Sequence, residues 1–119
     1  MIKKWAEGTE GRYGYQNLGV VVGATYPKEA QELREILPKA WFLIPGFGAQ
    51  GGGAQGAVVG INQDGFGGIV NSSRGIIAAW KGGKFKSQAE NFDRAAANAA
   101  EFAKDELNQA LKQAGKLNW

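Results

Sequence analysis

The sequence of 119 residues contains no cysteine and no histidine. Without cysteine the chain has no disulfide bonds and no thiolate metal sites, and without histidine it lacks the commonest general base and the commonest transition-metal ligand. Any chemistry has to rely on carboxylates, lysine, arginine or amide groups. We therefore expect neither a metal site nor a cofactor.

Long apolar segments are also missing. The chain begins Met1-Ile2-Lys3-Lys4-Trp5 and continues with charge and glycine, which does not resemble a signal peptide, and no later run has the length of a membrane span. The 14 basic and 11 acidic residues are spread along the chain, and the four tryptophans lie in four different segments, so neither set indicates a nucleic-acid surface. We expect a cytoplasmic protein that binds neither nucleic acid nor membrane.

Glycine is the abundant residue. Nineteen are present, concentrated between Gly46 and Gly75, where they alternate with apolar runs. Three such runs stand out, at 20–22, 41–44 and 69–70, and the first two are continuous rather than alternating, as in strands that are covered on both faces. The pattern predicts short parallel strands separated by glycine-rich loops.

Three segments carry helical patterns. The first spans 25–38, bounded by prolines, and a weaker one spans 54–61. The third and clearest begins with a capping box formed by Ser87 and Glu90 and ends at Gly115. The apolar residues expected on its buried face are Phe92, Ala96, Ala99, Ala103, Leu107 and Ala110.

Residues 1–119 are predicted to form one unit with three parts. Residues 1–18 are a lead-in, 19–80 hold the strand–helix units and their loops, and 81–119 form the closing helix. Alternating strands and helices imply a parallel α/β arrangement. Three strands cannot close a barrel and leave both sheet edges open, so another element is expected to cover them.

The segment Gly46–Gly51 matches the dinucleotide-binding pattern GxGxxG and follows a predicted strand. That motif also needs an acidic residue at the end of the next strand, whereas Asp64 precedes that strand in a turn. Three interpretations remain open: a nicotinamide site, a plain connecting loop, or a phosphate cradle. The cradle is favoured because Gln50 offers an amide donor and Arg74 a planar fork suited to phosphate oxygens.

The competing interpretation of Arg74 is a solvated surface charge, and that of Ser72 is helix capping. Asp64, Asp93 and Asp105 fall in a turn and on a helix without a convergent partner. The sequence therefore predicts no catalytic residues.

Three segments, VVVGATYPKE, WFLIPGFGAQGG and DGFGGIVNSSRGI, occur in that order. Together they closely resemble the longer bacterial-type orotidine 5'-phosphate decarboxylases. The resemblance implies an α/β fold equal to the C-terminal half of a TIM (β/α)8 barrel, strands six to eight with their helices. The edges of this half barrel would be covered by oligomerisation or by a partner half.

The resemblance also implies roles for individual residues. Gln50 and Arg74 would hold the substrate phosphate together with the backbone N–H of Gly75, and Pro45 would lie beside the pyrimidine. Gly53 replaces an acidic residue that the family usually has after the double glycine. The family's Asp and Lys network, built around a DxKxxD motif on an earlier strand, has no counterpart in the sequence.

These features suggest the C-terminal phosphate-binding half of a lyase that converts orotidine 5'-monophosphate to uridine 5'-monophosphate and carbon dioxide in pyrimidine biosynthesis. Alone, this half would be inactive. The alternatives are a non-enzymatic nucleotide or phosphate binder, one subunit of a split decarboxylase, or a rearranged fold. The expected partners are the two nucleotides and either a second copy or a complementary half-barrel chain.

Overall fold

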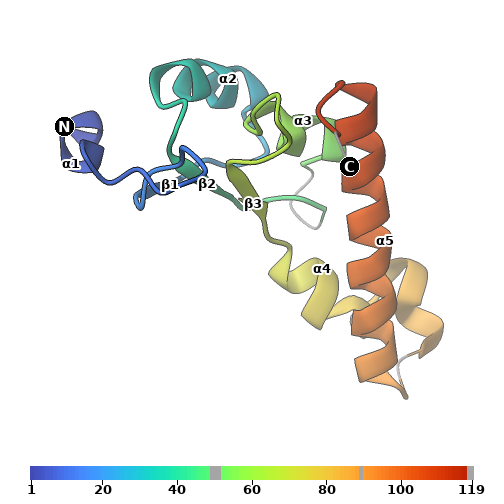
Figure 1. Ribbon diagram of the computed structural model, residues 1–119. Coiled ribbons are helices and arrows are strands. Elements are labelled where there is room, and N and C mark those ends of the chain that lie inside the picture. The colour runs from blue at the N-terminus through green and yellow to red at the C-terminus, as the bar shows by residue number, and fades with distance from the viewer. Residues whose placement is uncertain (49–51, 89, 118–119) are drawn as a thin grey trace.

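The computed structural model describes residues 1–48, 52–88 and 90–117. Parallel strands alternate with helices, and Figure 1 shows α1 and α5 on opposite sides of the sheet. In chain order the elements are α1 (Ile2–Ala6), β1 (Gly19–Val21), α2 (Pro27–Ile36), β2 (Trp41–Ile44), α3 (Ala54–Val59), β3 (Gly68–Val70), α4 (Ser73–Ile77), the 3₁₀ helices η1 (Ala79–Lys81) and η2 (Gly83–Gln88), and α5 (Phe92–Gln113).

The three strands form one parallel sheet in the order β1-β2-β3. The register places Val21 beside Leu43 and Leu43 beside Ile69. Each strand lies within one residue of an apolar run in the sequence. The three predicted parallel strands are confirmed.

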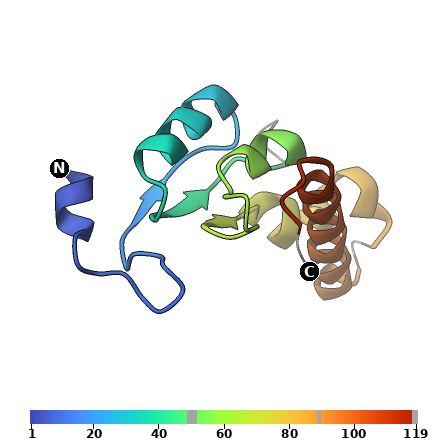
Figure 2. The same cartoon turned by 45° about the horizontal axis from the view of Figure 1, so that its top comes forward.

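Helices cover only one face of this sheet. Phe42 and Ile44 point toward the helices and are 0% and 2% exposed, whereas Leu43 between them is 43% exposed. Figure 2 shows α2 and α3 together on the covered side. The β1–α2–β2 and β2–α3–β3 connections are both right-handed crossovers, and the sheet grows in one direction from β1 to β3. Both helices therefore lie on the same face of the sheet. The prediction that the strands are covered on both faces is therefore wrong for the described part of the chain.

The main core lies between the covered face and the helices. A second, smaller cluster joins Ala79 of η1 to Ala95 and Ala99 of α5, with Trp80 and Phe85 packed against it. The main core consists of Val22, Ala24, Ala30, Leu37, Ala40, Phe42, Ile44, Phe47, Ala54, Ala57, Val58, Ile61, Ala110 and Leu111. Many of these side chains are small, which allows the helices to pack closely on the short strands.

Helix α2 starts at a proline, whose fixed φ suits a first helical turn, and ends just before the next proline, as predicted. Its buried residues are Ala30 and Arg34. Leu33 and Ile36 are 37% and 51% exposed. A charged residue thus occupies the core side of this helix.

Helix α5 is the predicted closing helix, but it begins later than expected. Its N-cap is Asn91, without a side-chain capping bond, and Ser87 belongs to η2. The predicted capping box is wrong because α5 begins at Phe92, and Ser87 lies in η2, four residues before the N-cap. Phe92 is 65% exposed, and the buried positions are instead Ala95, Ala99, Ala110 and Leu111. None of the helices in the described ranges has the length and apolar character needed to cross a membrane.

Candidate functional site

The loops that follow β2 and β3 leave the sheet side by side. Backbone pairing continues past the strands: the N–H of Ala24 donates to the carbonyl of Pro45 at 2.8 Å, and the N–H of Asn71 donates to the carbonyl of Ile44 at 3.2 Å. The side-chain alternation of the strands therefore extends into the loops. Side chains from both loops meet at the carboxyl ends of the strands.

The glycine-rich loop after β2 is closed at its base by its own backbone. The N–H of Gly48 donates to the carbonyl of Gly52 at 2.9 Å, and the N–H of Gly52 donates to the carbonyl of Gly46 at 3.1 Å. Gly46 and Gly48 have φ angles of 93° and 78°, which glycine adopts without strain. A Cβ on Gly52 would lie 2.6 Å from the Gly46 oxygen. Gln50 falls outside the described residues, so its predicted role stays a prediction.

A serine fastens the second loop to the first. The hydroxyl of Ser72 donates to the carbonyl of Phe47 at 2.9 Å. Ser72 stands at the N-cap position of α4, but its side chain makes no capping bond and reaches across to the other loop instead. Gly75 lies against this hydroxyl, because a Cβ there would collide with the Ser72 oxygen. A side chain at position 75 would therefore displace the Ser72 hydroxyl from its bond to Phe47.

A cavity of about 70 Å³ separates the two loops and is lined by residues 45–47 and 71–74. This volume holds about two water molecules. Pro45 and Arg74, both predicted site residues, line it from opposite loops. Gly75 follows directly in α4.

The polar groups around this cavity are incompletely paired. Arg74 is exposed, and its guanidinium makes no hydrogen bond or ion pair with any residue that the structure describes. The Oδ1 atom of Asn71 is buried and likewise has no partner among those residues. Leaving such an acceptor unsatisfied costs about 1–3 kcal/mol. Asn71 lines the same cavity as Arg74, and the sequence interpretation did not predict its unpaired acceptor.

None of the three aspartates weighed in the sequence lines this cavity, although Glu106 of α5 lines a neighbouring cavity together with Gly48, Ser72 and Gly75. Asp64 stands in the turn before β3, and Asp93 and Asp105 are on α5. In the described ranges, no three His, Cys, Asp or Glu side chains gather closely enough to hold a metal. The lining residues 45–47 and 71–74 include no acid and no lysine. Their chemistry suits anion binding.

A second charged centre lies at the amino ends of the strands and involves a buried arginine. Arg34 of α2 is 8% exposed, and its guanidinium carbon lies 3.7 Å from the centroid of the Phe42 ring. Burial lowers the pKa of Arg34. Its three nitrogens donate at 2.8–2.9 Å to the carbonyls of Leu37, Ala40, Gly60 and Gly67. Because backbone carbonyls occupy its donors, Arg34 is a structural residue.

Lys116 plays a similar part at the end of α3. Its ammonium donates to the carbonyls of Val58, Val59 and Ile61 at 2.9, 3.1 and 2.7 Å. Burial lowers the pKa of Lys116, and Arg34 lowers it further. A cation at a helix C-terminus satisfies carbonyls that have no intrahelical partner.

Tyr15 connects the lead-in to the turn before β3. Its hydroxyl lies 2.8 and 2.9 Å from the two carboxylate oxygens of Asp64 and accepts a bond from the Asn62 amide at 3.0 Å. Burial raises the pKa of Tyr15, and the hydrogen bond to Asp64 raises it further. Asp64 therefore has a partner that the sequence did not reveal, because the two residues are 49 positions apart.

Parallel strand–helix units with polar loops at the carboxyl ends of the strands are typical of α/β barrels. Solved structures agree with this class. The chain superimposes on UMP synthase of Leishmania donovani with a TM-score of 0.59 and 32% identity, covering 92% of this chain and 22% of that one. It also matches a Toxoplasma gondii protein assigned as an orotidine-monophosphate decarboxylase, with a TM-score of 0.64 and 30% identity, covering 93% and 37%.

Curated relatives give the same result at the level of sequence, although no family model matches the chain. Orotidine 5'-phosphate decarboxylase of Clostridium novyi is 42% identical over 115 residues, which are 97% of this chain and 37% of the relative. That of Haloarcula marismortui is 47% identical over 98 residues, covering 81% and 35%. By sequence the chain is similar to orotidine 5'-phosphate decarboxylases over most of its own length, and it spans only about a third of the length of these relatives.

Proposed function

We propose that this chain is the C-terminal phosphate-binding part of an orotidine 5'-phosphate decarboxylase, equivalent to barrel strands six to eight. In this proposal β1, β2 and β3 take those three places, and their carboxyl ends form part of the active-site face. The chain would bind orotidine or uridine 5'-monophosphate by the phosphate and would not decarboxylate alone.

One observation carries this proposal: the loops after β2 and β3 are fastened to each other beside an unpaired guanidinium. The bond from Ser72 to Phe47 fixes the spacing of the loops, and Arg74 lines the cavity between them. An arginine fork binds phosphate oxygens in a bidentate manner. Gln50 and the N–H of Gly75 would complete the cradle, and Pro45 would lie beside the base.

A phosphate grip of this kind contributes to catalysis from a distance. Binding energy from a part of the substrate that does not react can be used to order and close the site around the reacting carbon. The acid, base and lysine chemistry would have to come from residues outside this chain, since the sequence contains no DxKxxD motif.

The proposal is tested by titrating the chain with uridine 5'-monophosphate in a calorimeter. A hydrogen bond to a charged group contributes about 1.5–3 kcal/mol, so Arg74→Ala is expected to weaken binding by about 10- to 100-fold. Arg94→Ala, at an exposed arginine on α5, is the matched control and is expected to bind as the unchanged chain does.

A decarboxylation assay with orotidine 5'-monophosphate on the same samples separates the alternatives. No turnover together with binding that depends on Arg74 supports the proposal. Equal binding by the two arginine variants contradicts the assigned phosphate site. Decarboxylation by the chain alone contradicts the proposal that the catalytic groups lie outside this chain. Nucleotide binding that adding the remaining part of a relative does not improve would favour a non-enzymatic binder.

A further inference from the structure

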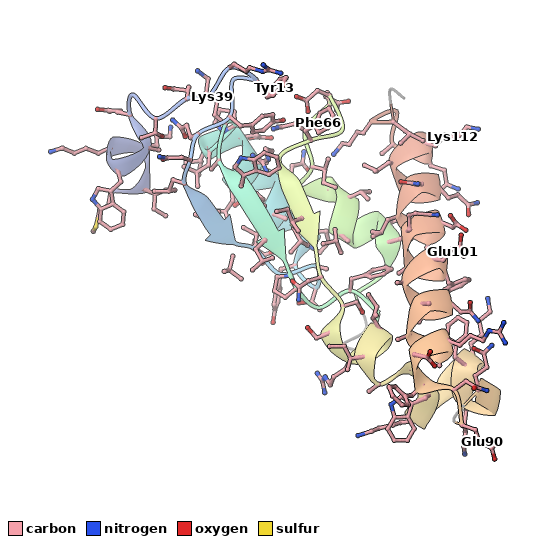
Figure 3. All side chains as sticks on the ribbon, turned by 60° about the horizontal axis from the view of Figure 1, so that its bottom comes forward. Tyr13, Lys39, Phe66, Glu90, Glu101 and Lys112 are labelled. Atoms are coloured by element: carbon pink, nitrogen blue, oxygen red, sulfur yellow. The ribbon has the colours of Figure 1, made fainter. Side chains whose placement is uncertain are left out.

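A cavity of about 550 Å³ lies at the amino ends of the strands, away from the candidate site. It is lined by Tyr13, Tyr15, Trp41, Asp64 and Phe66, four aromatic side chains and one carboxylate. Figure 3 shows Tyr13 and Phe66 close together at this end of the sheet. The volume is within the usual range of small-molecule sites. We refer to these five residues as the aromatic cage.

Contacts within the chain hold the walls of the aromatic cage in place. The N–H of Gly11 donates to the carbonyl of Tyr15 at 2.8 Å, which closes this part of the lead-in into a turn. The centre of the Tyr15 ring lies 5.0 Å from that of the Trp41 ring. Asp64 accepts bonds from the Tyr15 hydroxyl and, at 2.9 Å, from the N–H of Phe66. The carboxylate thus joins walls from segments 49 positions apart.

Of the five residues, only Asp64 carries a formal charge. No lysine or arginine belongs to the lining, and Asp64 makes no ion pair within the described part of the chain. Arg34 attracts Asp64 from outside the lining, but its donors are taken up by backbone carbonyls. The guanidinium carbon of Arg12 lies 4.6 Å from the centroid of the Tyr13 ring. One ring of the cage therefore already attracts a cation of the chain itself.

The lining also indicates which kind of cation fits. Aromatic faces beside a carboxylate attract organic cations. A primary ammonium and a guanidinium both carry several N–H donors, and each buried donor needs an acceptor. The cage offers few acceptors, because Asp64 already accepts bonds from Tyr15 and Phe66 and the remaining walls are aromatic. A quaternary ammonium group has no donor to satisfy, so it matches this lining best.

We infer that the aromatic cage binds a small quaternary ammonium compound, held by cation–π attraction to the rings and by the charge of Asp64. The cage shares no residue with the lining of the candidate cavity, residues 45–47 and 71–74. The inference therefore does not rest on the proposed function. Because the cage joins the lead-in to the turn before β3, the bound cation would also stabilise the folded chain.

The test titrates the chain with choline chloride at constant ionic strength and follows the indole N–H signal of Trp41 by nuclear magnetic resonance. The Trp41→Phe variant assigns this signal. The matched probe is the neutral alcohol in which a carbon atom replaces the choline nitrogen, because it has nearly the same shape without the charge. Choline is expected to bind about 5- to 30-fold more tightly than this alcohol, as a cation–π contribution predicts.

Three variants locate the binding. Tyr13→Leu removes one wall and is expected to weaken choline binding by at least about threefold. Asp64→Asn removes the charge at nearly constant shape and is expected to weaken the binding of choline but not of the alcohol. Tyr26→Leu, at a residue 64% exposed at the N-cap of α2, is the matched control and should bind choline as the unchanged chain does. Tyr13 is 77% exposed, so its replacement should leave the fold intact, which circular dichroism checks.

Tighter binding of choline than of the alcohol, dependent on Tyr13 and Asp64, supports the inference. Three results would overturn it. The first is the absence of a saturable change in the Trp41 signal. The second is equal binding of choline and the alcohol, which would make the cavity a purely apolar one. The third is equal binding of choline by Tyr13→Leu and Tyr26→Leu, which would place the ligand outside the cage.

Discussion

Arg34 and Arg74 lie at opposite ends of the same parallel sheet and place the same guanidinium group in opposite surroundings. Arg34, at the amino ends of the strands, is buried and donates to four carbonyls at 2.8–2.9 Å. Arg74, at the carboxyl ends, is exposed and makes no polar contact within the described ranges. The first holds the protein together, and the second is available to a ligand.

The comparison shows that a shifted pKa does not by itself locate a functional site. Three groups with shifted pKa values at the amino ends, Arg34, Lys116 and Tyr15, already have hydrogen-bond partners inside the protein. Structural networks perturb pKa values as active sites do. The donors and acceptors that lack partners are the better guide, and they lie at the other end of the sheet.

The largest expected effect is that of Arg34→Ala. The substitution leaves buried carbonyls at the ends of α2 and α3 and before β2 and β3 without a donor, so we expect the free energy of unfolding to fall by more than about 3 kcal/mol. Urea denaturation followed by circular dichroism measures the change. Arg74→Ala is the matched control, with an expected change within about 0.5 kcal/mol. Equal losses of unfolding free energy in the two variants would contradict the assignment of Arg34 as structural and Arg74 as free for a ligand.

Gly52→Ala tests the base of the glycine-rich loop. A Cβ at this position meets the backbone oxygen of Gly46 at 2.6 Å, which cannot move without breaking the loop closure. We expect a loss of about 1–3 kcal/mol from overpacking, measured by the same denaturation. Gly82→Ala is the control, because a Cβ there meets nothing within 4 Å and the backbone is extended. Similar stabilities for both variants would contradict the close packing described for this loop.

Ser72→Ala removes the side-chain bond that joins the two site loops. The expected cost is about 1 kcal/mol, the usual net value of one hydrogen bond. Nucleotide binding is expected to weaken as well, because the spacing of the loops is no longer fixed. Ser73→Ala, at an exposed neighbour, serves as the control for stability, and Arg94→Ala serves as the control for binding. If Ser72→Ala binds the nucleotide as well as Arg94→Ala does, the tie to Phe47 is not what positions the loops.

The smallest effect is expected at the amino ends, from Tyr15→Phe, and it depends on pH. Because burial and Asp64 raise the pKa of Tyr15 above its ordinary value, the folded state keeps the phenol protonated where the unfolded state ionises. The contribution of the protonated Tyr15 to the free energy of unfolding is therefore complete below about pH 10. It is lost as the pH rises through the pKa that Tyr15 has in the folded protein.

Tyr15→Phe is expected to lose about 1 kcal/mol or less at neutral pH and to decline less steeply above about pH 10. Denaturation at a series of pH values, with Tyr13→Phe as the control, measures this difference. Lys116 changes the pH dependence of the unfolding free energy in the opposite direction, because its pKa is lowered. It is present in both tyrosine variants, so its effect cancels when they are compared. Parallel pH curves for the two tyrosine variants would contradict the role of Tyr15.

The sequence predicted the regular elements well, because they depend on local patterns. Continuous apolar runs located the strands, and flanking prolines located α2. The start of α5 was predicted wrongly, since Ser87 and Glu90 fit a capping pattern that the 3₁₀ helix η2 overrides. The prediction that both faces of the sheet are covered was also wrong. A continuous apolar run such as 41–44 looks the same in the sequence whether one face of the strand is covered or both.

Only part of the lining of the candidate cavity was predicted. Pro45 was named by resemblance, Arg74 was named both by its planar guanidinium and by resemblance, and both line the cavity, while their roles stay predictions. The bond from Ser72 to Phe47 and the unpaired oxygen of Asn71 depend on contacts between loops about 25 residues apart, which no local pattern contains. The structural role of Arg34 was missed for the same reason.

The contacts of Arg34 also constrain the order in which the chain can fold. Its partners at Gly60 and Gly67 lie 26 and 33 residues further along the chain. During synthesis, α2 and β2 leave the ribosome before either of these carbonyls, so Arg34 then has only the nearby carbonyls of Leu37 and Ala40 as acceptors within the chain. Its remaining donors stay solvated until the residues that introduce β3 follow. We expect a nascent chain halted before Gly67 to hold α2 on the strands less firmly than the full chain does.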